Sequence, residues 1–342
     1  MSEVFVVFPP AINNGVIYGR NSFSFCCKEI LFFSPNDGTV KCQSTDIPKE
    51  SNTFGYILNG TCGANDQKIS ISTLFADNKP AEGLSALDLT KLALERSDSA
   101  EKAVEVISTL IDKYNKDESV DISPKYAFFI CDIKEAYVMN IVGKLWAAER
   151  ITEGCRAFGK GFAVTTKIDK KSQELEDKLK EIALFDGSSE LNFSQTFSME
   201  VAEIKWPNDE PVSGFSAQKM FEVLRSSAEC SETIASSFVS VLKESVAVHW
   251  FTGTPDPRES VFKPFIFTND ARISTLTALK EDDETPLRKL HENRKWDQVG
   301  ELLKSLEKSC VDEIDGYVEN APTDELNELL KDCVEAEVKF YR

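Results

Sequence analysis

The chain has 342 residues, with 57 acidic and 39 basic side chains and a formal net charge of −18. This charge disfavours nucleic-acid backbones and anionic membrane surfaces as partners. No apolar run approaches the roughly 18 residues that a membrane-spanning helix needs. We therefore expect a globular protein that binds no nucleic acid and does not insert into a membrane.

The start of the chain and its cysteines predict a cytoplasmic location. Glu3 precedes an apolar run of only five residues, which does not fit a secretory signal peptide. The nine cysteines are an odd number and show no paired spacing. Such a pattern is typical of reduced thiols in the cytosol.

The first predicted element is a buried strand over residues 4–8, where five apolar residues precede Pro9 and Pro10. A continuous apolar run indicates burial on both faces, and prolines end a strand because they lack an amide donor. Asn14-Gly15 is a strong hairpin signal, so residues 16–20 should return antiparallel. This pairing places Arg20 beside the start of the chain.

The next part of the chain alternates between strands and helices. Strands are expected over residues 29–33, 54–58 and 69–73. Residues 86–96 read as a helix, and a second follows a capping box formed by Asp98 and Glu101. These helices should lie on a sheet. Strand character then returns as far as residue 166, with strands expected at 126–131, 136–141 and 144–148.

The second half begins with an amphipathic helix over residues 170–185, which has a charged, solvated outer face. The polar stretch 186–213 is interpreted as a surface excursion rather than a functional flap. Further helices and strands are then expected: helices at 216–225 and 231–242, strands at 246–251 and 261–268, and charged helices at 287–309, 311–320 and 324–340.

The order of these elements predicts the fold class. Strands, helices, strands and helices in succession suggest two sheets sandwiched between helical layers. We expect an α+β protein with a four-layer αββα sandwich. Residues 1–342 should form a single domain, with residues 286–342 as a C-terminal helical extension packed on it.

Common cofactor and metal motifs are absent: the sequence has no phosphate-binding glycine loop, no GxSxG, and no CxxC or HExxH pair. No cofactor and no metal are therefore expected. His249 alternates within a strand and is assigned a structural role, and His291 is expected to be exposed on a charged helix. The adjacent Cys26 and Cys27 are interpreted as incidental, and Cys62 as a bystander thiol in a loop.

Several segments together resemble the secernins, relatives of the C69 dipeptidases in the N-terminal nucleophile (Ntn) hydrolase superfamily. They are FVVFPP and VIYGRNS near the start, GKLWAAERITEG from Gly143, TTKID from Thr165, LNFSQTFS from Leu191, HWFTGTPDP with SVFKPFIF from His249, and CVEAEVKFY at the end. The resemblance covers most of the chain. It implies the four-layer sandwich of Ntn hydrolases, the chemistry of a cysteine dipeptidase and an association with regulated exocytosis.

The resemblance also implies where the nucleophile should stand. In these enzymes a Cys, Ser or Thr leads the first strand, and its own α-amino group can serve as the base. The matching position here, directly before Phe5, is Val4. An isopropyl group can neither ionise nor form an acyl-enzyme, so covalent catalysis through this position is excluded.

Other matched positions depart from the family pattern as well. Arg20 is kept, but Phe23 replaces the carboxylate of the Arg-Asn-x-Asp pattern. Thr73 falls where relatives carry Asn-Glu-Ala, Asn140 stands for a glutamate, and Gly161 aligns with a side-chain donor. Departures at one pocket point to loss of the chemistry, and the first hypothesis is a secernin-like pseudoenzyme that acts by binding, in regulated exocytosis.

Two alternatives remain open. The first is an active cysteine or serine dipeptidase or amidohydrolase of the C69 type with a displaced nucleophile: Ser2 after removal of Met1, Cys62 or Cys26. Ser2 lies two residues early, about 7 Å from the expected position in an extended strand, and should be out of hydrogen-bond reach of the same donors.

The second alternative is a binding module. In it the vestigial pocket, lined by Val4 and Phe23, holds a peptide or small molecule without cutting it. Protein partners are compatible with both the pseudoenzyme and the binding module. The sequence predicts no particular oligomeric state.

Overall fold

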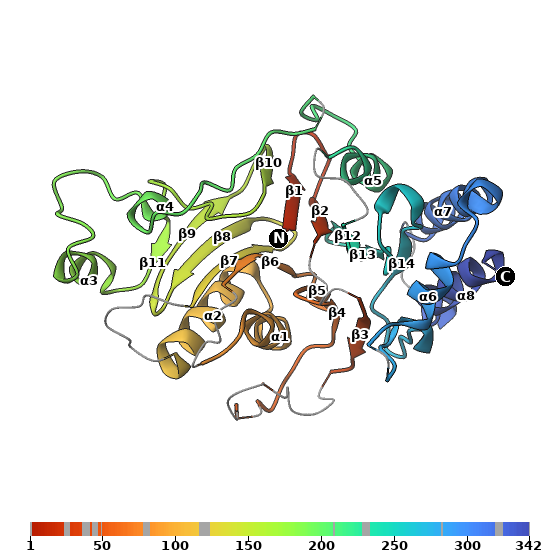
Figure 1. Cartoon of the computed structure of the whole chain (residues 1–342), viewed down its shortest axis with the longest axis horizontal. Coiled ribbons are helices and arrows are strands. Elements are labelled where there is room, and N and C mark those ends of the chain that lie inside the picture. The colour runs from red at the N-terminus through yellow and green to blue at the C-terminus, as the bar shows by residue number, and fades with distance from the viewer. Residues whose placement is uncertain are drawn as a thin grey trace.

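The computed structural model describes residues 2–23, 28–35, 42, 47–48, 50–77, 83–115, 124–207, 209–227, 233–281, 283–318 and 324–341, without the side chains of 315–318 and 324. It is a mixed α/β structure with two antiparallel sheets (Figure 1). We call them the β1 sheet and the β7 sheet, each after one of its strands.

The β1 sheet contains the predicted N-terminal hairpin. Its spatial order is β10 (Cys155–Phe158), β1 (Ser2–Val7), β2 (Val16–Ser22), β12 (Ser236–Leu242), β13 (Ala247–Phe251) and β14 (Lys263–Phe265). Strand β1 is buried along its whole length, as its apolar run predicted. The antiparallel pairing of β1 with β2 is confirmed, and it sets Val4 opposite Arg20.

The β7 sheet is formed by the middle of the chain and by the strands that follow the first hairpin. Its order is β11 (Lys170–Lys171), β9 (Leu145–Ile151), β8 (Ala136–Val142), β7 (Lys125–Cys131), β6 (Ser70–Ala76), β5 (Cys62–Asn65), β4 (Tyr56–Asn59) and β3 (Ile30–Phe33). The register between β6 and β7 shifts between Thr73 and Phe75. Such a bulge re-aims backbone groups, and this one lies where the two sheets meet.

The helices begin at side-chain caps that the sequence supplies. Ser85 and Asp88 form a capping box for α1 (Ala86–Arg96). The predicted box at Asp98 and Glu101 is wrong, because the Ser99 side chain caps α2 (Ala100–Tyr114) by accepting from the Lys102 amide. The remaining helices are α3 (Leu175–Glu181), α4 (Phe193–Thr196), α5 (Ala217–Ser226), α6 (Pro286–Glu292), α7 (Trp296–Val318) and α8 (Leu329–Phe340), with 3₁₀ turns at Pro257–Glu259, Thr275–Thr277 and Asp324–Leu326.

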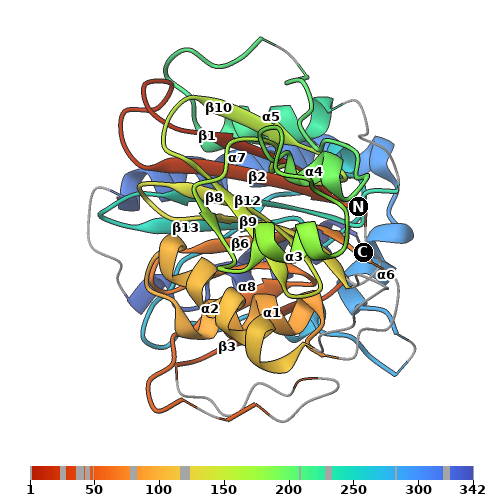
Figure 2. The same cartoon turned by 90° about the vertical axis from the view of Figure 1, so that its left-hand side faces the viewer.

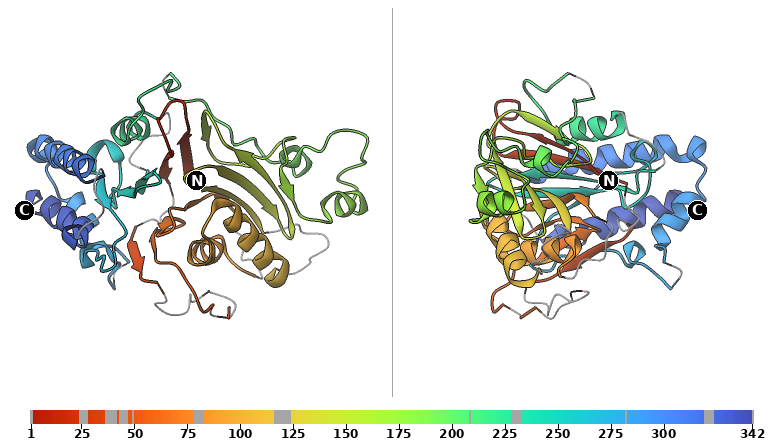
Figure 3. Two further views of the ribbon diagram at one scale, coloured as in Figure 1. Left: turned by 180° about the vertical axis from the view of Figure 1, so that it is seen from behind. Right: turned by 60° about the vertical axis from the view of Figure 1, so that its left-hand side comes forward.

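Three apolar clusters hold these elements together. The first joins residues from both sheets, for example Val4 of β1 and Phe129 of β7. The second joins the β7 sheet to α1 and α2, and the third joins the β1 sheet to α5, α7 and α8. Figures 2 and 3 show α1 and α2 on one side of the molecule and α5 on the other. We call the side of each sheet that faces the other sheet its inner face.

The predicted helix over residues 231–242 is wrong in its second part, which forms strand β12. Successive side chains alternate between two clusters: Phe238 faces the inner cluster and Val239 the outer one. A period of two with β-branched residues favours a strand, and both neighbouring strands, β2 and β13, pair with it.

Three further expectations are corrected. Of the helix predicted over 170–185, only α3 forms, because Lys170–Lys171 pair with β9. The polar stretch 186–213 is not simply a surface excursion, since Phe193 is fully buried in the inner cluster. Helix α7 runs through the break predicted at residue 310, because Cys310 and Val311 are both buried and continue its apolar side.

Candidate functional site

The candidate site lies on the inner face of β1 and β2, where Ser2 and Arg20 meet. Side chains two apart on a strand share a face, so Ser2 lies on the same side as Val4. The guanidinium of Arg20 donates to Ser2 Oγ from Nε at 3.1 Å and from Nη2 at 2.7 Å. Both residues are buried, with 3% and 1% of their surfaces exposed.

Arg20 also reaches across to the β7 sheet. Its Nη2 lies 3.2 Å from Thr61 Oγ1 and 3.4 Å from the carbonyl oxygen of Thr73. The Thr73 carbonyl lies at the bulge of β6, beside the residues where the register shifts. Arg20 therefore links both sheets through hydroxyl and carbonyl oxygens, and Thr61 belongs to the site although the sequence did not single it out.

The expectation that Ser2 lies out of reach is wrong. Backbone register places Arg20 opposite Val4 and Ser22 opposite Ser2. The long Arg20 side chain nevertheless extends along the strand to the Ser2 hydroxyl. The two strand positions remain about 7 Å apart along the strand, and the Arg20 side chain is long enough to span that distance.

Val4 itself is a core residue. Its side chain is 0% exposed and belongs to the apolar cluster between the sheets. On the other side of β1 its backbone pairs with Phe158 of β10. The position matched to the nucleophile therefore carries an apolar group that packs between the sheets.

Among the described contacts of Arg20, none is with Phe23, Asn140 or Gly161. Phe23 is half-buried just beyond β2. Asn140 is fully buried on β8, where its Oδ1 accepts from the Val164 amide at 2.7 Å. Gly161 has φ +134°, and a Cβ there would lie 2.4 Å from the Glu200 carbonyl oxygen. No side-chain donor can stand at that position without moving the backbone.

Of the alternative nucleophiles, the structure describes Ser2 and Cys62. Cys62 is not in a loop, because it begins strand β5 and is 1% exposed. Its Sγ donates to the Asn59 carbonyl at 3.3 Å. Met1, Cys26 and Cys27 lie outside the described residues.

A second group of polar contacts crosses between the sheets beyond Arg20. Tyr18 and Ser72 share a hydrogen bond. Ser240 Oγ lies 2.8 Å from Ser70 Oγ and 2.8 Å from His249 Nδ1. The sequence signal for this group is the presence of Ser70 and Ser72, two residues apart, within strand β6, because such spacing puts both on one face.

Burial keeps the aromatic members of this group uncharged. It raises the pKa of Tyr18 well above its usual value and lowers the pKa of His249 to about 3. His249 is fully buried, as its assigned structural role requires. At neutral pH these residues form a neutral hydrogen-bonded network between the sheets.

The expectation that His291 is exposed is wrong. It is 1% exposed, and its Nδ1 lies 3.2 Å from the Tyr341 hydroxyl of the C-terminal segment. Burial, together with the nearby Arg294 charge, lowers the pKa of His291 to about 2.

A buried ion pair joins the last helix to the β1 sheet. Glu337 of α8, which accepts a hydrogen bond from Tyr341, also pairs with Lys263 at 2.7 Å. Both members of that ion pair are fully buried. The last helix is thereby fixed to β14.

Within the described ranges, no three His, Cys, Asp or Glu side chains are placed to hold a metal ion together. Nor does any helix in the part of the chain that the structure describes combine the length and apolar character needed to cross a membrane.

No family model matches the chain. The chain is similar to the structure of penicillin V acylase from Agrobacterium tumefaciens with a TM-score of 0.43 and 10% sequence identity, over 78% of this chain and 86% of that chain.

Proposed function

We propose that this protein is a catalytically inactive, secernin-like member of the Ntn hydrolase superfamily that acts by binding. The observation that carries the proposal is Val4. It stands opposite Arg20 in the hairpin register, is fully buried and belongs to the apolar core. An enzyme of this superfamily needs a thiol or hydroxyl in that place to attack an amide carbonyl.

The packing supports the four-layer αββα arrangement as part of this proposal. One apolar cluster lies between the two sheets, and two further clusters join each sheet to helices. Clusters of this kind are expected for a succession of helix, sheet, sheet and helix, which is the arrangement we propose.

The proposed role is cytoplasmic binding in regulated exocytosis, supported by the secernin-like segments of the sequence. For a ligand at the vestigial site, the buried Arg20 favours a carboxylate, because a guanidinium can bind both carboxylate oxygens at once. The C-terminus of a peptide carries such a group. It would have to displace the Ser2 hydroxyl, which the guanidinium now binds.

The test is hydrolysis of a panel of dipeptides and N-acyl amino acids by purified protein. We expect no turnover above that of the Arg20→Met variant prepared in parallel, which controls for contaminating peptidases. A variant carrying Val4→Cys, with residues 1–3 removed so that Cys leads the chain, is also expected to be inactive because Phe23, Asn140 and Gly161 differ from the family pattern. Turnover by the unmodified chain that disappears in Arg20→Met would refute the proposal.

A second candidate function rests on the contact between Ser2 and Arg20. If Met1 is removed, Ser2 carries a free α-amino group that can accept the proton of its own hydroxyl. The Arg20 guanidinium, which donates to Ser2 Oγ, favours deprotonation of that hydroxyl. The candidate is a serine amidohydrolase. Mass spectrometry of the N-terminus decides whether Ser2 has a free α-amino group. An intact Met1 or an acetylated Ser2 excludes the serine amidohydrolase. With a free Ser2, loss of turnover in Ser2→Ala would support it.

A further inference from the structure

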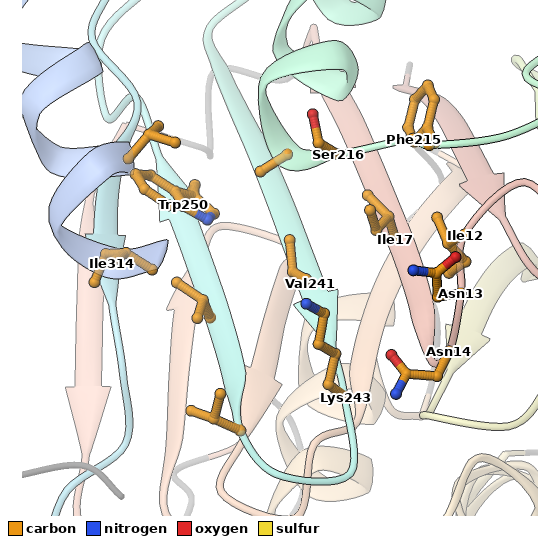
Figure 4. Close-up of a pocket in the computed structure, with 15 residues that line it drawn as sticks. Ile12, Asn13, Asn14, Ile17, Phe215, Ser216, Val241, Lys243, Trp250 and Ile314 are labelled. Atoms are coloured by element: carbon orange, nitrogen blue, oxygen red, sulfur yellow. The ribbon is translucent and has the colours of Figure 1, made fainter. Parts of the chain in front are cut away.

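A cavity of about 210 Å³ lies on the outer face of the β1 sheet, away from Arg20. Its walls come from β2, β12, β13, α5 and α7 (Figure 4). Ser2, Val4, Arg20 and Thr73 do not line it. Whatever binds here does so independently of hydrolysis at the candidate site.

The walls of the cavity are largely apolar. Ile17, Val241, Val248 and Ile314 contribute aliphatic side chains from four different elements. An apolar protein cavity of about 150 Å³ is large enough to hold benzene. The present cavity therefore has room for one aromatic ring and a few further atoms.

One polar group inside the cavity has no partner. Trp250 on β13 is 2% exposed, and its indole Nε1 makes no hydrogen bond to any described residue. Figure 4 shows this nitrogen turned toward Val241 and the open part of the cavity. A buried donor without an acceptor is rare in folded proteins. A ligand oxygen in the cavity would supply the acceptor.

A cation stands at the edge of the same cavity. Lys243 follows directly after β12 and is half-buried. No carboxylate of the described residues lies within ion-pair distance of its ammonium. In Figure 4 the ammonium points toward Val241, as the indole nitrogen does from the other side. An anionic group beside Val241 would lie on the side toward which both nitrogens point.

We propose that this cavity binds a small arylalkyl monocarboxylate. The aromatic ring lies among Ile17, Val248 and Ile314, and the carboxylate pairs with Lys243 while accepting a hydrogen bond from Trp250 Nε1. A single negative charge matches Lys243, the one cation among the described residues that line the cavity. The cavity volume limits the body of the ligand to about one ring with a short chain.

The experiment uses 3-phenylpropionate as the probe and the full chain as the protein. The indole N–H signals of the four tryptophans are followed in ¹⁵N spectra, and Trp250→Phe identifies the Trp250 signal. We expect this signal to shift on titration, with the Trp146 signal unchanged because Trp146 lies in the cluster against α1 and α2. A titration that leaves the Trp250 signal in place overturns the proposal.

Affinities measured by calorimetry test each contact separately. Trp250→Phe keeps the ring size but removes the donor, and Lys243→Met keeps the length but removes the charge. Each should weaken 3-phenylpropionate binding by about tenfold, the effect of losing one hydrogen bond or ion pair to a charged group. Lys243→Met, at the rim, remains informative even if Trp250→Phe does not fold.

Two controls complete the design. The exposed Lys160→Met, far from the cavity lining, should bind the probe as the unmodified chain does. The neutral 3-phenylpropanol should bind about tenfold more weakly than the acid, and Lys243→Met should no longer distinguish the two compounds. Equal affinity for acid and alcohol in the unmodified chain would contradict the assigned role of Lys243.

Discussion

The two faces of the β1 sheet differ in what surrounds their polar groups. On the inner face Arg20, Ser240 and His249 are buried and make hydrogen bonds within the core, although His249 Nε2 has no partner among the described residues. On the outer face Trp250 is equally buried, yet its indole nitrogen borders a cavity and bonds to no described residue. The inner face is packed around its polar groups, whereas the outer face keeps space for a ligand.

Polar side chains on the two faces are therefore expected to have different roles, in stability on the inner face and in ligand binding on the outer face. A polar group that is paired in the core contributes to stability, and its loss leaves a buried partner unsatisfied. A polar group that borders a cavity contributes little until a ligand arrives. Substitutions on the inner face should therefore change the free energy of unfolding, and those on the outer face should change affinity.

The largest effect is expected where a buried cation pairs with a buried carboxylate. Glu337→Gln leaves the fully buried Lys263 ammonium without its counter-charge. Breaking such a pair from one side costs about 3–5 kcal/mol. Denaturant unfolding measures the change, and Glu328→Gln, from the more exposed pair with Arg272, serves as the matched control. Equal unfolding midpoints for the two variants would show that Lys263 does not depend on α8.

Arg20→Met is expected to have the next largest effect. The variant removes the donors to Ser2 and Thr61 from the buried region between the sheets. Leaving buried partners unsatisfied costs about 2–3 kcal/mol in total. The exposed Arg272→Met should unfold close to the parent. If Arg20→Met were as stable as that control, the inner face would not be the packed structure described above.

The free energy of unfolding should also decrease as the pH falls, because two histidines are buried. Burial lowers the pKa of His249 to about 3 and that of His291 to about 2, whereas an unfolded histidine has a pKa of about 6.5. The unfolded chain therefore binds more protons, so this stability is present above pH 6.5 and is lost as the pH falls. Between pH 7 and pH 6 the two should together cost about 1 kcal/mol.

Unfolding curves of His249→Gln at the two pH values test this expectation. Losing one of the two titrating groups should reduce the difference in unfolding free energy between pH 7 and pH 6 by about half. A parent protein whose stability does not change over this interval would mean that the histidines are accessible to protons in the folded state.

The smallest change in stability is expected on the outer face. Lys243→Met removes a half-buried side chain without an ion pair among the described residues, so unfolding should shift by no more than about 0.5 kcal/mol. The same variant is the one expected to lose about tenfold in affinity for 3-phenylpropionate. Thermal unfolding with and without the probe separates the two effects, since only the parent should be stabilised appreciably by the ligand.

The sequence predicts this fold best where local signals decide the structure. The apolar run from Val4 and the Asn14-Gly15 turn predict the first hairpin, and with it the pairing of Val4 and Arg20. The predicted helix fails over residues 236–242, where the alternation of side chains favours a strand and where the segment pairs with the distant β2 and with β13 directly after it. The pairing with β2, which belongs to the first hairpin, leaves no trace in a local window.

The candidate site shows the same limit. The absence of a nucleophile at Val4 can be read from the sequence alone, because a side chain that cannot ionise needs no geometry to exclude it. The contacts of Arg20 with Thr61 and Ser2 could not be predicted, since they depend on how far one side chain reaches between two sheets. The burial of His291 likewise depends on Tyr341, fifty residues further along the chain.

The order of strands in the β1 sheet has a consequence for synthesis on the ribosome. The hairpin of β1 and β2 is complete by Ser22, but its neighbours β10 and β12 begin only at Cys155 and Ser236. At a synthesis rate of about 5–20 residues per second, the interval between completion of the hairpin and the start of β12 is on the order of 10–40 s. For that time two apolar strands have unpaired edges, a state prone to intermolecular pairing. The nascent chain is thus expected to depend on chaperones that shield β1 and β2 until β10 and β12 emerge.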